Sequence, residues 1–218
     1  MAKKKAQKEK GFIAASLENF WYYYKWPFIG GIVLFFAVLV FMSSAVDTSV
    51  PTDVDVVSVF ARPLTMQEYE FQSRLQDQVS DVDNSGSVVI GTEGLYISEG
   101  GKSDNDLLNQ NKFEVKMAYA QGDLVLMDGT NMERFISKDL WAPLTDYVDI
   151  SGFPKEDIYY RNGVPVAVRL SDSKILTDMQ FIIDNVYAGI MFVPEELKDT
   201  APLRRENAAK MLLKLTEK

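Results

Sequence analysis

The longest apolar run in the chain places the strongest constraint on its fold. Residues 27–46 read PFIGGIVLFFAVLVFMSSAV and contain no charged, amide-bearing or imidazole side chain. At a rise of about 1.5 Å per residue, a helix of this length spans about 30 Å, which matches the hydrocarbon core of a bilayer. Buried helices of globular domains and the apolar parts of signal peptides are usually shorter, at about 10 to 15 residues. The run therefore predicts a transmembrane helix over residues 27–46.

The charges on the two sides of this run differ. Six lysines and two glutamates precede it, whereas the residues that follow it are acidic and reach no basic side chain before Arg62. Positive charge gathers on the cytoplasmic side of membrane helices. We therefore expect a single-pass protein of the cell membrane, with the N-terminus in the cytoplasm and residues 47–218 outside the cell.

An aromatic segment lies between the lysines and the run. Residues 11–26, GFIAASLENFWYYYKW, carry large apolar side chains at helical spacing and end in a cluster of tryptophans and tyrosines. Such side chains gather where lipid headgroups meet hydrocarbon. We predict a basic cytoplasmic tail with an interfacial helix over residues 1–26, and contact with membrane lipid through residues 12–46. A basic tail without this helix is the alternative, and it leaves the topology unchanged.

A cleaved signal peptide is the competing interpretation of the apolar run. Ser43 and Ala45 form the small-x-small pattern of a cleavage site, and the N-terminus is basic. The apolar part of a signal peptide, however, has about 7 to 15 residues, and here the run is longer and begins only after residue 26. A membrane anchor is the better account of the run.

Composition limits what the segment outside the membrane can do. Of the 23 basic and 31 acidic residues in the chain, 17 and 29 follow the run, which gives residues 47–218 a net charge of −12. This charge excludes binding of nucleic acid through bulk electrostatics. The chain has neither cysteine nor histidine, which excludes disulfides, thiolate or imidazole metal ligands, and Ser–His or Cys–His nucleophile pairs. We expect no cofactor.

Strand-like and helix-like patterns alternate after an acidic linker over residues 47–55. The strand-like runs are residues 55–60, 87–91, 94–98, 123–129, 164–170 and part of 181–193. Capping boxes, formed by Thr65 with Glu68 and by Ser103 with Asp106, mark two helices between them. The alternation predicts one α/β or α+β domain over residues 56–218, with a largely parallel sheet flanked by helices.

The helix that begins at Ser103 carries several apolar side chains at helical spacing. We predict that they form its buried stripe. They are Leu107, Leu108, Val115, Ala118 and Tyr119.

One region resembles a known family. Residues 113–149, FEVKMAYAQGDLVLMDGTNMERFISKDLWAPLTDYVD, are similar to a part of bacterial extracytoplasmic solute-binding proteins, the two-lobed kind associated with transporters. There a helix ending in Ala-x-Gly-Asp leads into a strand, a short helix and a Pro-Leu-x-x-Tyr segment. Residues 162–165 and the pair Val193-Pro194 resemble later landmarks of that family. The resemblance implies a non-catalytic domain that binds a small solute or a membrane-protein partner such as a transporter. Residues 47–218 are few for two lobes, so we expect about one lobe held at the membrane.

The candidate ligand site follows from the rule that open parallel sheets bind ligands at the carboxyl ends of their strands. The candidate residues are Arg62 and Thr65 after the first strand and Asp128, Gly129, Thr130 and Asn131 after the strand that begins near residue 123. If these two strands are parallel neighbours, Arg62 and Asp128 lie on the same edge of the sheet. The alternative is that all six are ordinary turn and helix-cap residues.

One motif is similar to a calcium-binding loop. Asp81, Asp83 and Ser85 occupy alternate positions in DVDNSG, as ligands do in an EF-hand. The bidentate glutamate of that loop belongs where this chain has Thr92, and Glu93 comes one residue late. Because a polar turn explains the same residues, we expect no metal and keep the calcium-like loop as the alternative.

Three function classes remain after these exclusions. In the first, which we expect, the chain is a membrane-anchored, non-catalytic, solute-binding-like protein that serves as a receptor or transport accessory. In the second, the outer domain is an extracellular hydrolase that uses a pair of carboxyl groups, as glycosidases do. In the third, it is a purely structural subunit of a membrane complex and has no ligand.

Overall fold

The structure of the 218-residue chain is a computed structural model. It describes residues 20–38, 51–63, 68–170, 172–179, 181, 185–193 and 202–218. The chain divides into two compact units, residues 1–49 and residues 50–218.

In the first unit, the described residues 20–38 form a continuous helix. All its side chains except that of Lys25 are exposed. The helix continues through Pro27, where the sequence suggested a boundary between an interfacial helix and a span. Across the described part of the chain, no helix combines the length and the apolar character needed to cross a membrane. Residues 12–19 and 39–46 of the predicted lipid-contacting segment lie outside the described residues.

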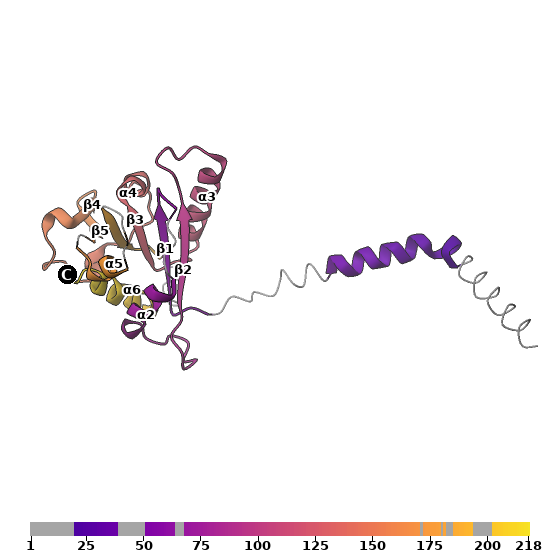
Figure 1. Ribbon diagram of the computed structural model, residues 1–218, viewed down its shortest axis with the longest axis horizontal. Coiled ribbons are helices and arrows are strands. Elements are labelled where there is room, and N and C mark those ends of the chain that lie inside the picture. The colour runs from indigo at the N-terminus through magenta and orange to yellow at the C-terminus, as the bar shows by residue number, and fades with distance from the viewer. Residues whose placement is uncertain are drawn as a thin grey trace, which may run out of the picture. The chain divides into compact units, whose positions relative to one another are not determined.

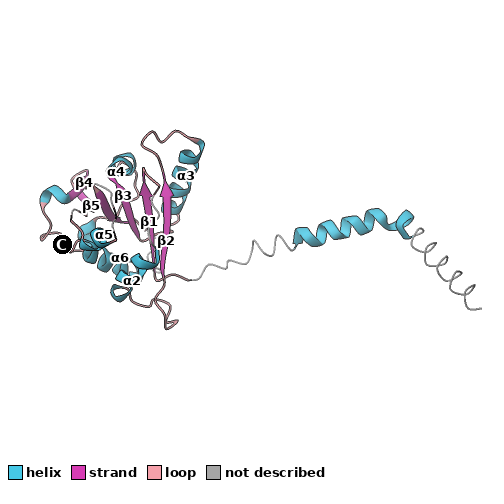
Figure 2. Cartoon of the chain, in the orientation of Figure 1, coloured by secondary structure: helices cyan, strands magenta, loops and turns pink. Residues whose placement is uncertain are grey.

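The second unit is built on a six-stranded sheet with the strand order β2-β1-β3-β6-β5-β4 (Figures 1 and 2). The strands are β1 (Val54–Phe60), β2 (Ile90–Tyr96), β3 (Leu124–Asp128), β4 (Ile158–Arg161), β5 (Val164–Arg169) and β6 (Val186–Ile190). β1 is parallel to both of its neighbours, β2 and β3, whereas the pairs β3–β6, β6–β5 and β5–β4 are antiparallel. The α/β class is confirmed, but the prediction of a largely parallel sheet is wrong, because the sheet is mixed.

The connections explain why the two halves of the sheet differ. The strands β1, β2 and β3 follow one another through helical segments, which is the crossover that parallel strands require. Further along, the chain turns back directly at Asn162 and Gly163, whose φ angles are 50° and 81°. This two-residue turn pairs Arg161 with Val164, and Asn-Gly is a favoured sequence for such hairpin turns. The turn therefore makes β4 and β5 an antiparallel pair.

Helices cover both faces of the sheet (Figure 1). They are α2 (Glu68–Leu75), α3 (Asp104–Ala118), α4 (Gly129–Phe135), α5 (Lys174–Asp178) and α6 (Pro202–Leu215), with short 3-10 turns at Gln76–Gln78, Leu144–Asp146 and Lys155–Asp157. α2, α5 and α6 pack on one face, and α3 and α4 on the other. Alternate residues of β1 and β3 contribute to the two cores, so the mostly apolar runs of these strands reflect burial on both faces.

The second unit begins before the predicted domain start at residue 56. β1 starts at Val54, and Asp53 is buried, so these residues belong to the fold and not to an acidic linker. The strand-like runs at residues 87–91 and 94–98 contribute to a single strand, β2, because Thr92 and Glu93 continue the pairing with β1.

Helix α3 begins as predicted but buries the opposite face. Ser103 and Asp106 form the expected capping box. The predicted stripe is exposed, and the buried side chains of α3 are those of Asp106, Phe113 and Met117. Apolar side chains lie on both sides of this helix, and the ring of Phe113 packs against that of Phe135 in the core. The other predicted capping box includes Thr65, which lies outside the described residues.

Candidate functional site

The predicted site lies at the edge of the sheet where β1 and β3 end, here called the carboxyl edge. β1 and β3 are parallel neighbours, so Arg62 and Asp128 follow the ends of adjacent strands, as expected. The backbone N–H of Ala61 donates a hydrogen bond to Oδ2 of Asp128. Arg62 is exposed, whereas Asp128 is only 8% exposed. The expected geometry is therefore present, but Asp128 belongs to the fold more than to the surface.

The Asp128 carboxylate is the N-cap of α4. Its Oδ1 accepts a hydrogen bond from the backbone N–H of Asn131 at 2.9 Å. A cap of this kind satisfies one of the N–H groups that the first turn of a helix leaves without a partner. Asp128 therefore ties the end of β1 to the start of α4.

Asn131 joins the same structural network. Its side chain is fully buried, its Nδ2 donates to the carbonyl oxygen of Ile97 at 3.2 Å, and its Oδ1 accepts from Nη1 of Arg134 at 2.7 Å. Gly129 is half-buried and Thr130 is exposed, while Thr65 lies outside the described residues. Of the five predicted residues that the structure describes, Arg62 and Thr130 are those whose side chains are exposed at this edge.

The calcium-like loop gathers three carboxylates. Oxygen atoms of Asp53, Asp81 and Asp83 lie within 4.8 Å of one another, and the sequence had not indicated Asp53. Each carboxylate is engaged by backbone N–H groups: Val82 and Val89 donate to Asp53 at 2.6 and 2.7 Å. In the same way, Gly86 donates to Asp81 and Ser85 donates to both Asp81 and Asp83.

Hydrogen bonds also set the acidity of this loop. Those from Ser85, its side chain first and then its backbone, lower the pKa of the Asp83 carboxyl below its usual range. Asn84 and Gly86 have positive φ angles of 56° and 84°, which are typical of tight turns. The arrangement accounts for residues 81–86 as a hydrogen-bonded polar turn.

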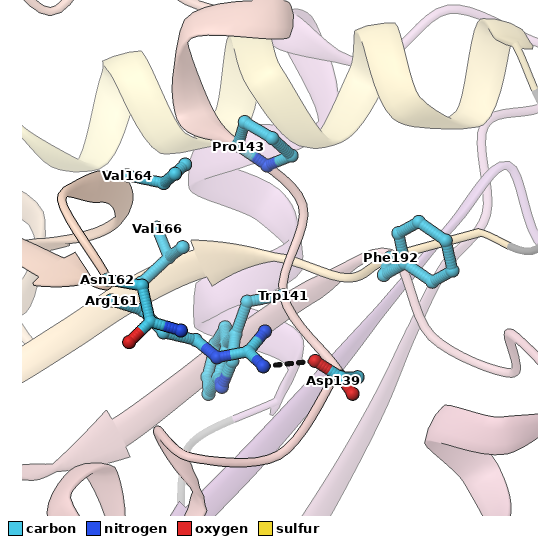
Figure 3. A pocket seen from close by; sticks show the side chains of 8 residues that line it. All are labelled: Asp139, Trp141, Pro143, Arg161, Asn162, Val164, Val166 and Phe192. Atoms are coloured by element: carbon cyan, nitrogen blue, oxygen red, sulfur yellow. Dashed lines mark hydrogen bonds and ion pairs between the residues drawn. The ribbon is translucent and has the colours of Figure 1, made fainter.

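A pocket of about 400 Å³ lies at the other edge of the sheet, where β1 and β3 begin (Figure 3). Its lining comes from three separate segments: the loop after α4, the β4–β5 hairpin and the residue that follows Met191. The lining residues are Asp139, Trp141, Pro143, Arg161, Asn162, Val164, Val166 and Phe192. We call it the Trp141 pocket.

Strand pairing fixes the position of the Trp141 pocket relative to the predicted site. β6 is antiparallel to β3, so that Val186 pairs with Asp128 and Ile190 with Leu124. Phe192 comes after Ile190 and therefore lies beyond the start of β3. The pocket and the carboxyl edge are thus at opposite edges of the sheet.

The backbone around Trp141 holds its ring against the sheet. Trp141 forms a bridge with Met191, and its Nε1 donates to the carbonyl oxygen of Phe135 at 3.1 Å. A Cβ on Gly189 would lie 2.7 Å from the Trp141 ring and 2.8 Å from the carbonyl oxygen of Val166. Only a residue without a side chain lets the ring approach β6 so closely. The indole is therefore a rigid wall of the pocket.

One ion pair supplies the charges among the described residues of the pocket lining. Arg161 donates from Nη2 to Oδ1 of Asp139, and Figure 3 shows its side chain extended toward that carboxylate. The Arg161 side chain is 21% exposed, whereas that of Asp139 is 93% exposed. The cation thus lies within the pocket wall, and its partner projects into solvent.

A second charge cluster at this edge has a structural role. Nη2 of Arg204 lies 2.7 Å from both Asp55 and Asp123, and Nη1 of Arg205 donates to the carbonyl oxygen of Gly122 at 2.9 Å. Burial opposes the charge on Arg204, but the hydrogen bonds and charges of Asp123 and Asp55 raise its pKa above the usual value. Burial lowers the pKa of Arg205. These contacts tie the start of α6 to the starts of β1 and β3.

The pocket residues were not among those predicted from sequence. Trp141 and the Asn162-Gly163 turn are visible in the sequence, but no local pattern shows that segments around residues 141, 164 and 192 converge. Only the antiparallel half of the sheet brings them together. Comparisons of the chain with models of protein families, with curated proteins and with solved structures found no match.

Proposed function

We propose that the chain is a single-pass membrane protein that displays its α/β domain outside the cell, and that this domain binds a small ligand or an extended partner at the Trp141 pocket without catalysing a reaction. The pocket carries the proposal. Its volume of about 400 Å³ and its mostly apolar lining match ligand sites, which are concave, usually about 300 to 1,000 Å³ and mainly apolar with few polar groups.

The character of residues 20–46 supports the membrane anchor. From Trp26 onward the described helix exposes uncharged, mainly apolar side chains, and the sequence stays uncharged through Val46. A helix that is apolar all round needs an apolar environment, and a bilayer supplies one. The lysines before this segment support a cytoplasmic N-terminus.

The order of elements supports a distant relation to one lobe of the solute-binding proteins. Helix α3, strand β3, helix α4 and the turn at Leu144–Asp146 follow one another in the order that the resemblance of residues 113–149 implies. Open parallel sheets bind ligands at the carboxyl ends of their strands. The binding surface in this proposal departs from that rule, because it lies at the edge where β1 and β3 begin.

The composition of the pocket lining favours binding over hydrolysis. Carboxylate-dependent cleavage of a glycosidic bond needs two carboxyl groups, about 5 to 10 Å apart, on either side of the bond. Among the described residues that line the Trp141 pocket, Asp139 is the single carboxylate. The lining therefore supplies a binding surface but one carboxyl group where hydrolysis needs two.

A fragment screen on the full-length protein in lipid nanodiscs tests the proposal. Small aromatic and aliphatic fragments are screened by saturation-transfer NMR against the natural chain and against Val164→Trp. Val164 is 40% exposed at the pocket mouth, so a larger side chain there fills the pocket with little disturbance of the core. We expect fragments that bind the natural chain to be lost from Val164→Trp.

Val115→Trp is the matched control for this screen. Val115 lies on the exposed face of α3. Helix α3 contacts β2 at one end of the strand order, whereas the β4–β5 hairpin is at the other end. Fragments are expected to bind this variant as they bind the natural chain. If Val164→Trp retains every fragment, the pocket is not the binding site and the proposed function fails.

A further inference from the structure

We infer that the Trp141 pocket selects an apolar molecule that carries a carboxylate, and that this carboxylate replaces Asp139 on the Arg161 guanidinium. The inference rests on the proposed function and adds the chemical class of the ligand. It follows from the position of one cation, the weakness of its present partner and the apolar walls beside it.

Arg161 is held in place before any ligand arrives. It is the last residue of β4, and the two-residue turn that follows fixes its pairing with Val164. Its side chain is 21% exposed and forms part of the pocket lining. A guanidinium offers five N–H donors in a planar fork that matches a carboxylate. Among the described residues, the side chain of Arg161 has a hydrogen-bond partner in Asp139 alone.

Asp139 is a partner that a ligand can displace. It lies in the loop after α4 with its side chain 93% exposed, so water can take over its solvation when the ion pair opens. Ion pairs with so exposed a partner contribute little to stability. Arg161 gains more from a carboxylate that enters the pocket, because the apolar walls beside it reduce the contact of the new ion pair with water, and charge-assisted hydrogen bonds are stronger in such surroundings.

The walls beside Arg161 define the rest of the ligand. Trp141, Pro143, Val164, Val166 and Phe192 present apolar surface, and Arg161 is the one cation among the described residues that line the pocket. A ligand with one negative group and an aromatic or branched aliphatic body therefore satisfies the lining. A doubly charged or strongly polar molecule would leave polar groups against these walls without partners, which is costly.

The acidity of the domain does not prevent anion binding at this site. Residues 47–218 carry a net charge of −12, but at physiological ionic strength charges are screened beyond about 8 Å. Arg161 is within contact distance of the ligand, so its charge dominates locally. The overall charge slows the approach of an anion more than it weakens the bound state.

Paired probes of equal shape test the inference. The full-length protein in nanodiscs of zwitterionic lipid is titrated with 3-phenylpropanoate and with its neutral analogue 3-phenylpropan-1-ol, and affinities are taken from saturation-transfer NMR. We expect the acid to bind about tenfold more tightly, as for one charge-assisted hydrogen-bonded pair. Arg161→Gln is expected to abolish the difference between the probes.

Asp139→Asn gives the sharper result. It removes the competing carboxylate, so binding of the acid is expected to strengthen about threefold or more while binding of the alcohol stays unchanged. Arg74→Gln is the control, because Arg74 is also ion-paired, to Glu70 and Asp178, but lies on α2 and outside the pocket lining. It is expected to change neither affinity.

The same chemistry has two sources, a free small acid and the C-terminus of a peptide. N-acetylphenylalanine and its amide distinguish them: tighter binding of the acetylated acid than of phenylpropanoate identifies a peptide end, and weaker binding identifies a free acid. Equal affinities for phenylpropanoate and phenylpropanol, or weaker binding of the acid to Asp139→Asn, would overturn the inference while leaving the fragment site intact. If Val164→Trp instead retains every fragment, the proposed function itself is refuted.

Discussion

Replacing Asp128 with alanine tests whether the carboxyl edge is a structural joint. The change removes the N-cap of α4, which costs about 1 kcal/mol. It also removes the charged acceptor of the Ala61 N–H, which costs about 1.5 to 3 kcal/mol. We therefore expect the free energy of unfolding to fall by about 2 to 4 kcal/mol. In a domain of this size, each kcal/mol lowers the Tm by about 2 to 4 °C, so the loss is large enough to measure.

The assay is urea unfolding of the full-length protein in mild detergent, read by pulse proteolysis of the outer domain. Thr130→Ala is the matched control, because Thr130 is two residues along and exposed, and we expect a change within about 0.5 kcal/mol. Asp128→Asn keeps one acceptor oxygen and a good cap, so its loss is expected to be smaller than that of Asp128→Ala. A cost below about 0.5 kcal/mol for Asp128→Ala would refute the structural role and restore Asp128 as a free surface group.

Three further measurements test other parts of the structure. Hydrogen bonds from Ser103 and then Ser98 lower the pKa of the Asp106 carboxyl. The contribution of Asp106 to stability is therefore complete above the unfolded pKa of about 4 and is lost as the pH falls through the folded pKa. Asp106→Asn is expected to lower the urea midpoint at pH 7 and to make that midpoint fall less steeply below about pH 4. Gly189→Ala is expected to destabilise the domain by about 1 to 3 kcal/mol through the clash with Trp141 and to abolish fragment binding, and unchanged stability would contradict the close packing of the indole. Protease added to intact cells is expected to remove residues 47–218 and to spare the lysine-rich N-terminus, whereas protection of the C-terminal half would reverse the proposed topology.

Much of the parallel half of the sheet can be predicted from sequence, for physical reasons. β1 and β3 read as mostly apolar runs because helices cover both faces of these strands. The capping box of α3 is legible because its two side chains satisfy N–H groups only three residues apart. Local signals of this kind do not depend on the rest of the fold.

The antiparallel half and the pocket depend on distant contacts and were missed. The pairing of β6 with β3 joins residues that are about sixty positions apart in sequence, and no local pattern specifies it. The buried face of α3 was also missed, because Leu108 and Val115 oppose Phe113 and Met117 around the helix, and both sets are apolar. Periodicity alone cannot choose between two apolar faces.

Helix α6 has a consequence for how the protein is made. It follows all six strands in the sequence, yet it contacts β1, β3 and β6, and its Ala208, Met211 and Leu212 are fully buried. During synthesis the part of this face that α6 covers therefore stays open until α6 leaves the ribosome, and under the proposed topology until α6 has crossed the membrane. Chains that stop before residue 202 keep their apolar strands open to proteases and to aggregation. Under the proposed topology, docking of this helix on the sheet is therefore the step after which the domain resists proteases.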